Sequence, residues 1–82
     1  MNSNFSSEEK FTQIILIFNY LTEHPDKGLT TIEAMYELQI TNLPKRISEM
    51  IVLGYPISKT PEYKLNAAGK VEKRYMRYRR AA

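Results

Sequence analysis

The sequence has no cysteine among its 82 residues, only three glycines, and no long apolar run. Without cysteine the chain can form neither a disulfide framework nor a thiolate metal site, which is compatible with a reducing compartment. The longest uninterrupted apolar stretch, Ile14 to Phe18, is far shorter than the roughly 20 residues of a membrane-spanning helix. The N-terminus is polar and acidic, unlike a signal peptide. We therefore expect a soluble protein of the cytoplasm that does not bind membranes.

The residues that catalysis usually requires are also scarce. The single histidine, His24, lies beside Pro25 in an expected loop, where a helix-terminal or solvent role is favoured over that of a general base. The sequence has no glycine-rich phosphate loop, no paired carboxylates in a plausible cleft and no cluster of metal ligands. We therefore expect no enzymatic activity, no cofactor and no metal site.

The charges are distributed very unevenly along the chain. Residues 1–41 contain two lysines against six acidic residues and have a net charge of −4, whereas residues 42–82 contain ten Lys and Arg against three Glu and have a net charge of +7. The mild overall value of +3 hides this asymmetry. A basic segment of this kind is typical of surfaces that bind polyanions.

Size and composition indicate one folded domain over residues 1–82, with frayed ends at 1–6 and 80–82. Hydrophobic residues make up 43% of the chain and charged residues 26%, which is an ordinary globular composition. A domain of this length has a marginal core that depends on close helix packing.

A first helix is predicted from a capping box of Ser6 and Glu9 to about Glu23, because Pro25 and Gly28 follow. Apolar residues at helical spacing predict its buried face. They are Phe11, Ile14, Ile15, Phe18 and Leu21, and Leu16 and Ile17 widen this face. Leu29 is expected to form a very short strand.

A second helix is predicted over residues 31–38, opened by a capping box of Thr30 and Glu33. Its inner face is expected to contain Ala34, Met35 and Leu38, with Glu33 and Tyr36 pointing outward. The turn that follows, residues 39–41, has Ile40 as its apolar plug.

A third helix is predicted over residues 42–53, with Thr41 as its cap, Pro44 in its first turn and Gly54 as its left-handed end. Its buried face is expected to consist of Leu43, Ile47, Met50 and Ile51.

The C-terminal part indicates a hairpin. Residues 55–59 read as a short edge strand, residues 60–69 as a loop containing Pro61, and residues 71–79 as an alternating strand. Three helices followed by a two-stranded β-hairpin wing predict a winged helix-turn-helix, an α+β fold that is mainly α.

The polar side of the third helix has candidate DNA contacts, because the second helix of a helix-turn-helix enters the major groove. Lys45 suits a phosphate or a guanine edge, Asn42 an adenine or a phosphate, and Ser48 either kind of contact. Glu49 repels phosphate unless it accepts a hydrogen bond from cytosine. Arg46 borders the buried face and is either a structural guanidinium, paired with a carboxylate such as Glu37, or a phosphate contact. A merely solvated helix face is the alternative.

A second group of basic candidates follows the third helix. Lys59, Lys64 and Lys70 are expected in or beside the hairpin loop, and the final strand adds Lys73, Arg74, Arg77, Arg79 and Arg80, interleaved with tyrosines. Such residues neutralise phosphates and make affinity fall steeply with salt. The alternatives are a charged edge strand that prevents aggregation and, for Arg79 and Arg80, a frayed tail.

Several segments resemble the small winged helix-turn-helix domains encoded by phages and prophages. They are LTTIEA at 29–34, ITNL at 40–43, RISEM at 46–50, GYPI at 54–57, Gly69-Lys70 and RYMRY at 74–78, so the resemblance covers about residues 11–80. It implies DNA binding by the third helix and the wing. The chain departs from the family at Gln39, where glycine is usual, and at Ile51, where arginine or another polar residue is frequent. Residues 69–74 also form a longer stretch than usual.

These observations leave three hypotheses of function. The first is a DNA-binding regulator or accessory factor of phage or prophage type, with double-stranded DNA as partner and a homodimer or larger partner for specificity. The second is a protein that binds a host protein, such as a nuclease or polymerase, and inhibits or adapts it. The third is a domain whose charge serves only solubility. Basic residues on one continuous face would favour the first, and an exposed apolar patch near Ile32, Tyr36 and Val52 would favour the second.

Overall fold

The computed structural model describes residues 7–81, so the predicted cap at Ser6 lies outside the described range. The elements are α1 (Ser7–Glu23), β1 (Leu29–Thr30), α2 (Thr31–Glu33), the π-helical turn η1 (Ala34–Leu38), α3 (Leu43–Val52), β2 (Ile57–Leu65) and β3 (Val71–Arg80). The predicted order of three helical segments and a hairpin is confirmed, and so is the short strand at Leu29.

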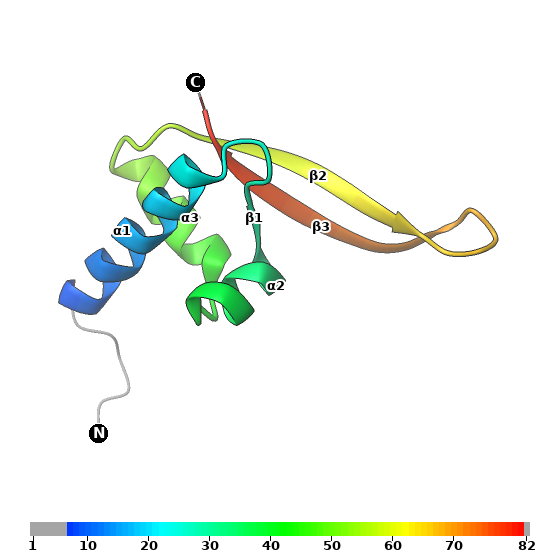
Figure 1. The fold of residues 1–82 in the computed structure, drawn as a ribbon, viewed down its shortest axis with the longest axis horizontal. Coiled ribbons are helices and arrows are strands. Elements are labelled where there is room, and N and C mark those ends of the chain that lie inside the picture. Colours follow the sequence, from blue (N-terminus) through cyan, green and yellow to red (C-terminus); the bar gives the residue numbers. More distant parts are fainter. Residues whose placement is uncertain (1–6, 82) are drawn as a thin grey trace.

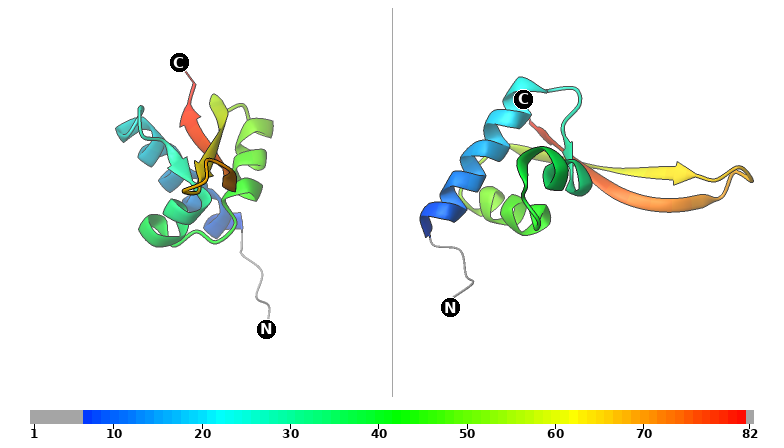
Figure 2. Two further views of the ribbon diagram at one scale, coloured as in Figure 1. Left: turned by 90° about the vertical axis from the view of Figure 1, so that its right-hand side faces the viewer. Right: turned by 60° about the horizontal axis from the view of Figure 1, so that its bottom comes forward.

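The helices form a body from which the β2–β3 hairpin projects as an arm (Figure 1). The antiparallel sheet has the order β1-β3-β2, with Leu29 opposite Tyr78 and Thr30 opposite Arg77. The hairpin is two-stranded beyond these pairs, and the right-hand view of Figure 2 shows it extending away from the helices. We use the word wing for this part, residues 61–76.

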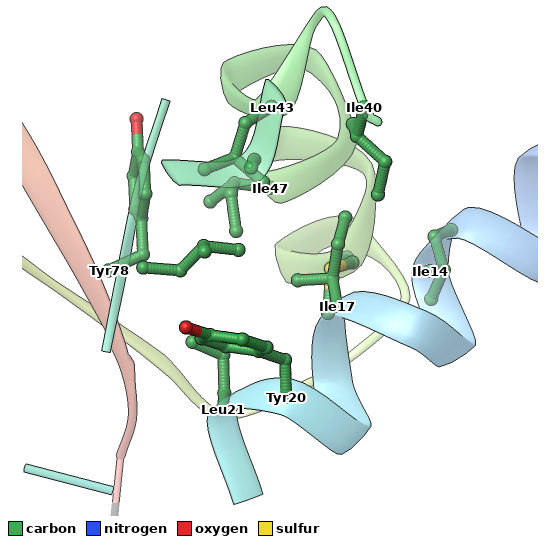
Figure 3. Close-up of a cluster of buried hydrophobic side chains, with 11 residues drawn as sticks. Ile14, Ile17, Tyr20, Leu21, Ile40, Leu43, Ile47 and Tyr78 are labelled. Carbon is green, nitrogen blue, oxygen red and sulfur yellow. The ribbon is translucent and has the colours of Figure 1, made fainter. Parts of the chain in front are cut away.

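The hydrophobic core lies where α1 and α3 meet the base of the sheet (Figure 3). Its fully buried side chains are Ile14, Ile17, Leu21, Leu29, Ile40, Leu43, Ile47 and Met50. The predicted buried face of α1 is partly wrong, because Phe11 and Ile15 are 47% and 54% exposed. Five consecutive apolar residues fit several helical stripes equally well, and the stripe of Ile14, Ile17 and Leu21 is the one that is covered.

The second helix covers the predicted residues 31–38, but only its first three residues are α-helical. Its capping box is confirmed: the Thr30 hydroxyl accepts from the Glu33 amide, and the Glu33 carboxylate accepts from the Thr30 amide. After one turn the helix widens into η1, which rotates Met35 outward to 45% exposure, so its predicted inward position is wrong. Gln39 takes a left-handed conformation with φ 58°, which is strained for a residue other than glycine.

The third helix begins at Leu43, and its N-cap position is Asn42 rather than the predicted Thr41. The Asn42 side chain makes no capping hydrogen bond. Ile51 is 42% exposed rather than buried, because the core contacts of α3 end at Met50. Gly54 ends the helix in a left-handed conformation as predicted.

The loop predicted over residues 60–69 is wrong, because β2 continues through Pro61 to Leu65. β2 is an edge strand, and proline removes no ladder hydrogen bond where the amide row faces solvent. The turn is confined to residues 66–70, where the Asn66 side chain accepts from the amides of Ala68 and Lys70.

The fraying predicted from residue 80 is wrong for the described residues. Arg80 belongs to β3, and the Ala81 amide donates to the Pro56 carbonyl at 2.9 Å. The Arg80 guanidinium also donates to the Thr22 hydroxyl and lies 4.9 Å from the centre of the Phe18 ring. The end of β3 is therefore fastened to α1.

One arginine fastens the base of the hairpin to the helical body. The Arg77 Nε donates to both carboxylate oxygens of Glu62, at 3.0 and 2.9 Å. Its Nη1 donates to the Lys27 carbonyl at 2.8 Å and to Glu33 at 3.2 Å. We call this group of Arg77, Glu62, Glu33 and the Lys27 carbonyl the Arg77 clamp.

The clamp predicts a pH dependence of stability. The hydrogen bond from Arg77 lowers the pKa of Glu62, so this carboxylate stabilises the fold above its unfolded pKa of about 4.3, and the contribution is lost as the pH falls below that value. In urea denaturation, Glu62→Gln should be less stable than the wild type at pH 7, and the difference should shrink towards pH 3. Glu72→Gln, whose carboxylate makes only an exposed 4.0 Å contact with Lys64, is the control. Parallel stability curves for wild type and Glu62→Gln would contradict this role.

Gly28 predicts a second effect on stability. It has φ 62°, and an added Cβ would overlap the Tyr78 carbonyl oxygen and lie 2.7 Å from the Arg79 side chain. Gly28→Ala should therefore lower the free energy of unfolding by more than about 2 kcal/mol. Gly69→Ala is the matched control, because its φ is 82° with open space around it, and its loss should be about 1 kcal/mol. Equal losses in the two variants would show that the close approach to β3 is unimportant.

Candidate nucleic-acid interface

Three of the predicted contact residues are exposed on α3 or at its start. Leu43 and Ile47 hold the opposite side of the helix in the core. Asn42, Lys45 and Ser48 are spaced by three residues and are all exposed, so they follow one stripe along the helix. Because Asn42 makes no capping hydrogen bond, its amide can be directed at a ligand.

Arg46 has a structural role, and the structure corrects its predicted partner. Only 4% of the residue is exposed. Its Nε donates to the Gln13 side chain at 2.9 Å, and its Nη1 forms an ion pair with Glu49. The guanidinium therefore joins α3 to α1 and does not face solvent as a phosphate contact would.

Glu37, the predicted partner of Arg46, belongs to a different group. It accepts a hydrogen bond from the Tyr20 hydroxyl at 3.0 Å and pairs with Lys27 at 3.3 Å. These interactions lower the pKa of Glu37, with the hydrogen bond from Tyr20 as the largest cause. The group holds η1 against the end of α1.

The predicted repulsion between Glu49 and phosphate is offset within the protein. The Glu49 carboxylate pairs with Arg46 and lies 3.8 Å from the Lys10 ammonium. It is directed towards α1, and its charge is balanced by these two cations. The outer stripe of α3 thus has a positive charge from Lys45 without a competing carboxylate.

The wing has the second group of exposed basic residues. Lys64, Lys70, Lys73 and Arg74 are all exposed. Lys64 lies directly opposite Lys73 in the register, and Arg74 lies opposite Tyr63, with its guanidinium 5.7 Å from the ring centre. Lys64, Lys73 and Arg74 also line a cleft of about 510 Å³ whose other wall is formed by α2.

Two basic residues predicted with this group lie elsewhere. Lys59 is exposed but lies at the base of the hairpin opposite Tyr78, not beside the loop. The Arg77 guanidinium is occupied by the clamp, and its side chain is 16% exposed. The candidate interface therefore consists of the α3 stripe and the wing, without Arg46, Glu49 or Arg77.

The sequence interpretation missed Tyr63 and the apolar end of the wing. Tyr63, Leu65 and Val71 are 51%, 57% and 55% exposed. The signal for them was the alternation of β2, which was not recognised because Pro61 was interpreted as ending the strand.

Apolar side chains are also exposed on the helical body. Val52 and Tyr36 are 86% and 81% exposed, and Ile32 is 45% exposed. Phe11, Val52 and Leu53 line a hollow of about 280 Å³ beside Ser48. This surface adjoins the end of the α3 stripe.

Two other kinds of feature are absent from the part of the chain that the structure describes. Within residues 7–81 no helix is long and apolar enough to cross a membrane. The same residues contain no group of three or more His, Cys, Asp or Glu side chains that could hold a metal ion.

Comparison with known proteins identifies a family. Residues 12–80 match the sequence model of a family described as a winged helix-turn-helix domain. No curated protein and no solved structure matches the chain significantly. The family match spans most of α1 and all of the later elements, including the α3 stripe and the wing. The chain therefore belongs to the family of winged helix-turn-helix domains, which indicates DNA as a partner.

Proposed function

We propose that this protein binds double-stranded DNA through α3 and the wing and has no catalytic activity. The observation that carries the proposal is the exposed stripe of Asn42, Lys45 and Ser48 on a helix whose opposite side is fixed in the core. In the major groove, Asn42 would pair with adenine or bond a phosphate, and Lys45 would contact guanine or a phosphate. Ser48 suits either kind of contact.

The wing would hold the DNA backbone. Lys64, Lys70, Lys73 and Arg74 are exposed on an arm that leaves the body, and Lys59 adds a cation near the base of the hairpin. Each phosphate that these residues neutralise releases condensed counterions, so binding should be strongly salt-dependent.

The finer role that we propose is that of a small regulator or accessory factor of the phage or prophage type that the sequence resembles. It would act in the bacterial cytoplasm, where the host and phage DNA lie. One domain of this size offers a small contact area, so high specificity would require a homodimer or a larger partner.

Fluorescence anisotropy with a mixed-sequence duplex at two salt concentrations tests DNA binding. Lys45→Ala combined with Lys70→Ala should weaken binding by about tenfold or more at low salt and reduce the salt slope by about 2, because two phosphate contacts are lost. Lys27→Ala is the charge-matched control, since Lys27 pairs with Glu37 outside the interface, and it should retain affinity. Absence of binding at low salt, or an equal loss in the control, would contradict the proposed interface.

A protein-binding function is the second candidate, and the exposed apolar side chains of Phe11, Val52 and Leu53 favour it. The partner would be a second copy of the chain or a host enzyme such as a nuclease or polymerase, which the protein would inhibit or adapt. An apolar patch beside the α3 stripe suits such a contact.

Substitutions in this patch separate the two functions. Phe11→Ser combined with Leu53→Ser should abolish self-association in sedimentation experiments, or capture of a defined partner, while DNA affinity remains within about twofold of wild type. Met35→Ser, at a residue that is 45% exposed on η1, is the control. A loss of DNA binding in the double variant would instead assign the patch to the DNA interface.

A further inference from the structure

The far end of the wing has an apolar pair. Leu65 lies opposite Val71 in the last register pair before the turn, and the two residues are 57% and 55% exposed. Directly opposite residues share a face of a hairpin, so the two side chains form one small apolar surface at the end of the arm.

Cations lie next to this apolar pair along the chain. Lys64 and Lys73 face each other in the preceding register pair, a register shift separates that pair from Leu65–Val71, and Lys70 ends the turn. Like charges directly opposite each other destabilise a hairpin, and Glu72, 4.0 Å from Lys64, offsets them only at an exposed position. A polyanion beside the strands would remove the repulsion, so the charges favour a polyanionic partner such as nucleic acid over a neutral protein groove.

The turn presents this end in a defined shape. The Asn66 Oδ1 atom accepts hydrogen bonds from the main-chain amides of Ala68 and Lys70 at 2.9 and 3.0 Å. The main-chain amide of Asn66 donates to the Lys70 carbonyl at 2.8 Å. Gly69 supplies the positive φ of 82° that the turn requires. An arm that is already ordered loses little conformational freedom on binding.

The length of the arm fits a second groove. Thr60 is the last residue of β2 whose β3 partner, Arg77, also pairs with β1. Leu65 lies five residues further along β2, which corresponds to about 16 Å of strand. Half a turn of B-DNA is about 17 Å, which is the step from one groove to the next. The part of the arm beyond β1 is therefore about as long as the step between neighbouring grooves.

A structural role for the pair is the competing interpretation, because cross-strand apolar pairs also stabilise hairpins near their turns. Such a role needs only the surfaces that the two side chains share, yet more than half of the surface of each residue is exposed. A pair of β-branched threonines would maintain the strand equally well. A structural role alone therefore does not account for the apolar character of Leu65 and Val71.

We propose that the wing bends DNA by inserting the Leu65–Val71 pair between base pairs in the minor groove, while Lys64, Lys70 and Lys73 hold the flanking phosphates. Apolar wedges that enter the minor groove unstack a base step and kink the duplex. This inference rests on the DNA binding proposed above and adds to it a deformation that phosphate contacts alone do not produce.

The test measures binding and bending on the same duplex, by anisotropy and by energy transfer between dyes at its two ends. Wild type should bind and increase the energy transfer. Leu65→Thr combined with Val71→Thr should remove that increase with at most about a tenfold loss of affinity. Lys64→Ala combined with Lys73→Ala should weaken binding and reduce the salt slope, because phosphate contacts are lost.

A second measurement uses the absence of tryptophan from the sequence. Val71→Trp places a single indole at the wing end, and stacking between bases should quench its fluorescence when duplex is added. Tyr36→Trp, at a residue that is 81% exposed on η1, is the matched control and should change little. Cross-strand NMR contacts between residues 65 and 71 show whether each variant keeps the hairpin.

The outcomes separate the inference from the function on which it rests. Absence of binding by wild type overturns both. Binding without bending, bending that persists in the double threonine variant with its hairpin intact, or an unquenched indole at position 71 overturns the inference and leaves DNA binding in place. Loss of bending together with a quenched indole supports it.

Discussion

The Arg77 clamp is the interaction on which the rest of the molecule depends. β1 contributes only two residues to the sheet, so its backbone ladder alone gives the hairpin little attachment to the helical body. Arg77 adds bonds to Glu62 on β2, to Glu33 at the start of the second helix and to the Lys27 carbonyl before β1. The same Glu33 closes the capping box with Thr30. One guanidinium thus sets the direction of the wing relative to the second helix, which leads into α3. The relative orientation of the wing and α3 decides whether they can contact the same duplex.

Arginine and lysine side chains differ in where the fold places them. Arg46, Arg77 and Arg79 bond acceptors within the protein, whereas Lys45, Lys64, Lys70 and Lys73 are exposed. A guanidinium has several donors in a rigid plane and can bridge separate acceptors, whereas an ammonium is a compact charge on a flexible stem. Arg77–Glu33 pairs a cation of the basic half with a carboxylate of the acidic half, and Lys10–Glu49 joins the two halves with the signs reversed. The charge left for a polyanion comes mainly from lysine.

Local signals predicted the element order, and long-range partners explain the errors. The Thr30–Glu33 box and Gly54 act within a few residues, so their positions were readable. The partner of Arg46 could not be predicted in this way. Gln13 is 33 residues away in the sequence, and it lies on α1, where the apolar residues allow several different buried faces. Pro61 was misread because its effect depends on whether its strand lies at an edge, which only the sheet order decides. Asn42, Lys45 and Ser48 were predicted correctly as exposed, since helical spacing alone sets their side of α3.

The exposed apolar side chains at the end of the basic arm distinguish a wing that only neutralises phosphates from a wing that also inserts between bases. An arm that only neutralises phosphates does not need the exposed apolar surface of Leu65 and Val71, and exposing this surface favours unwanted association between strand edges. Lysines opposite each other at positions 64 and 73 oppose such association, because two arms would bring four ammonium groups together. The same lysines leave a polyanion as the favoured neighbour of the apolar pair. A nucleic-acid duplex combines that negative charge with an apolar interior of stacked bases. Within three residues of its turn, the arm has lysines that match the charge and an apolar pair that matches the stacked bases.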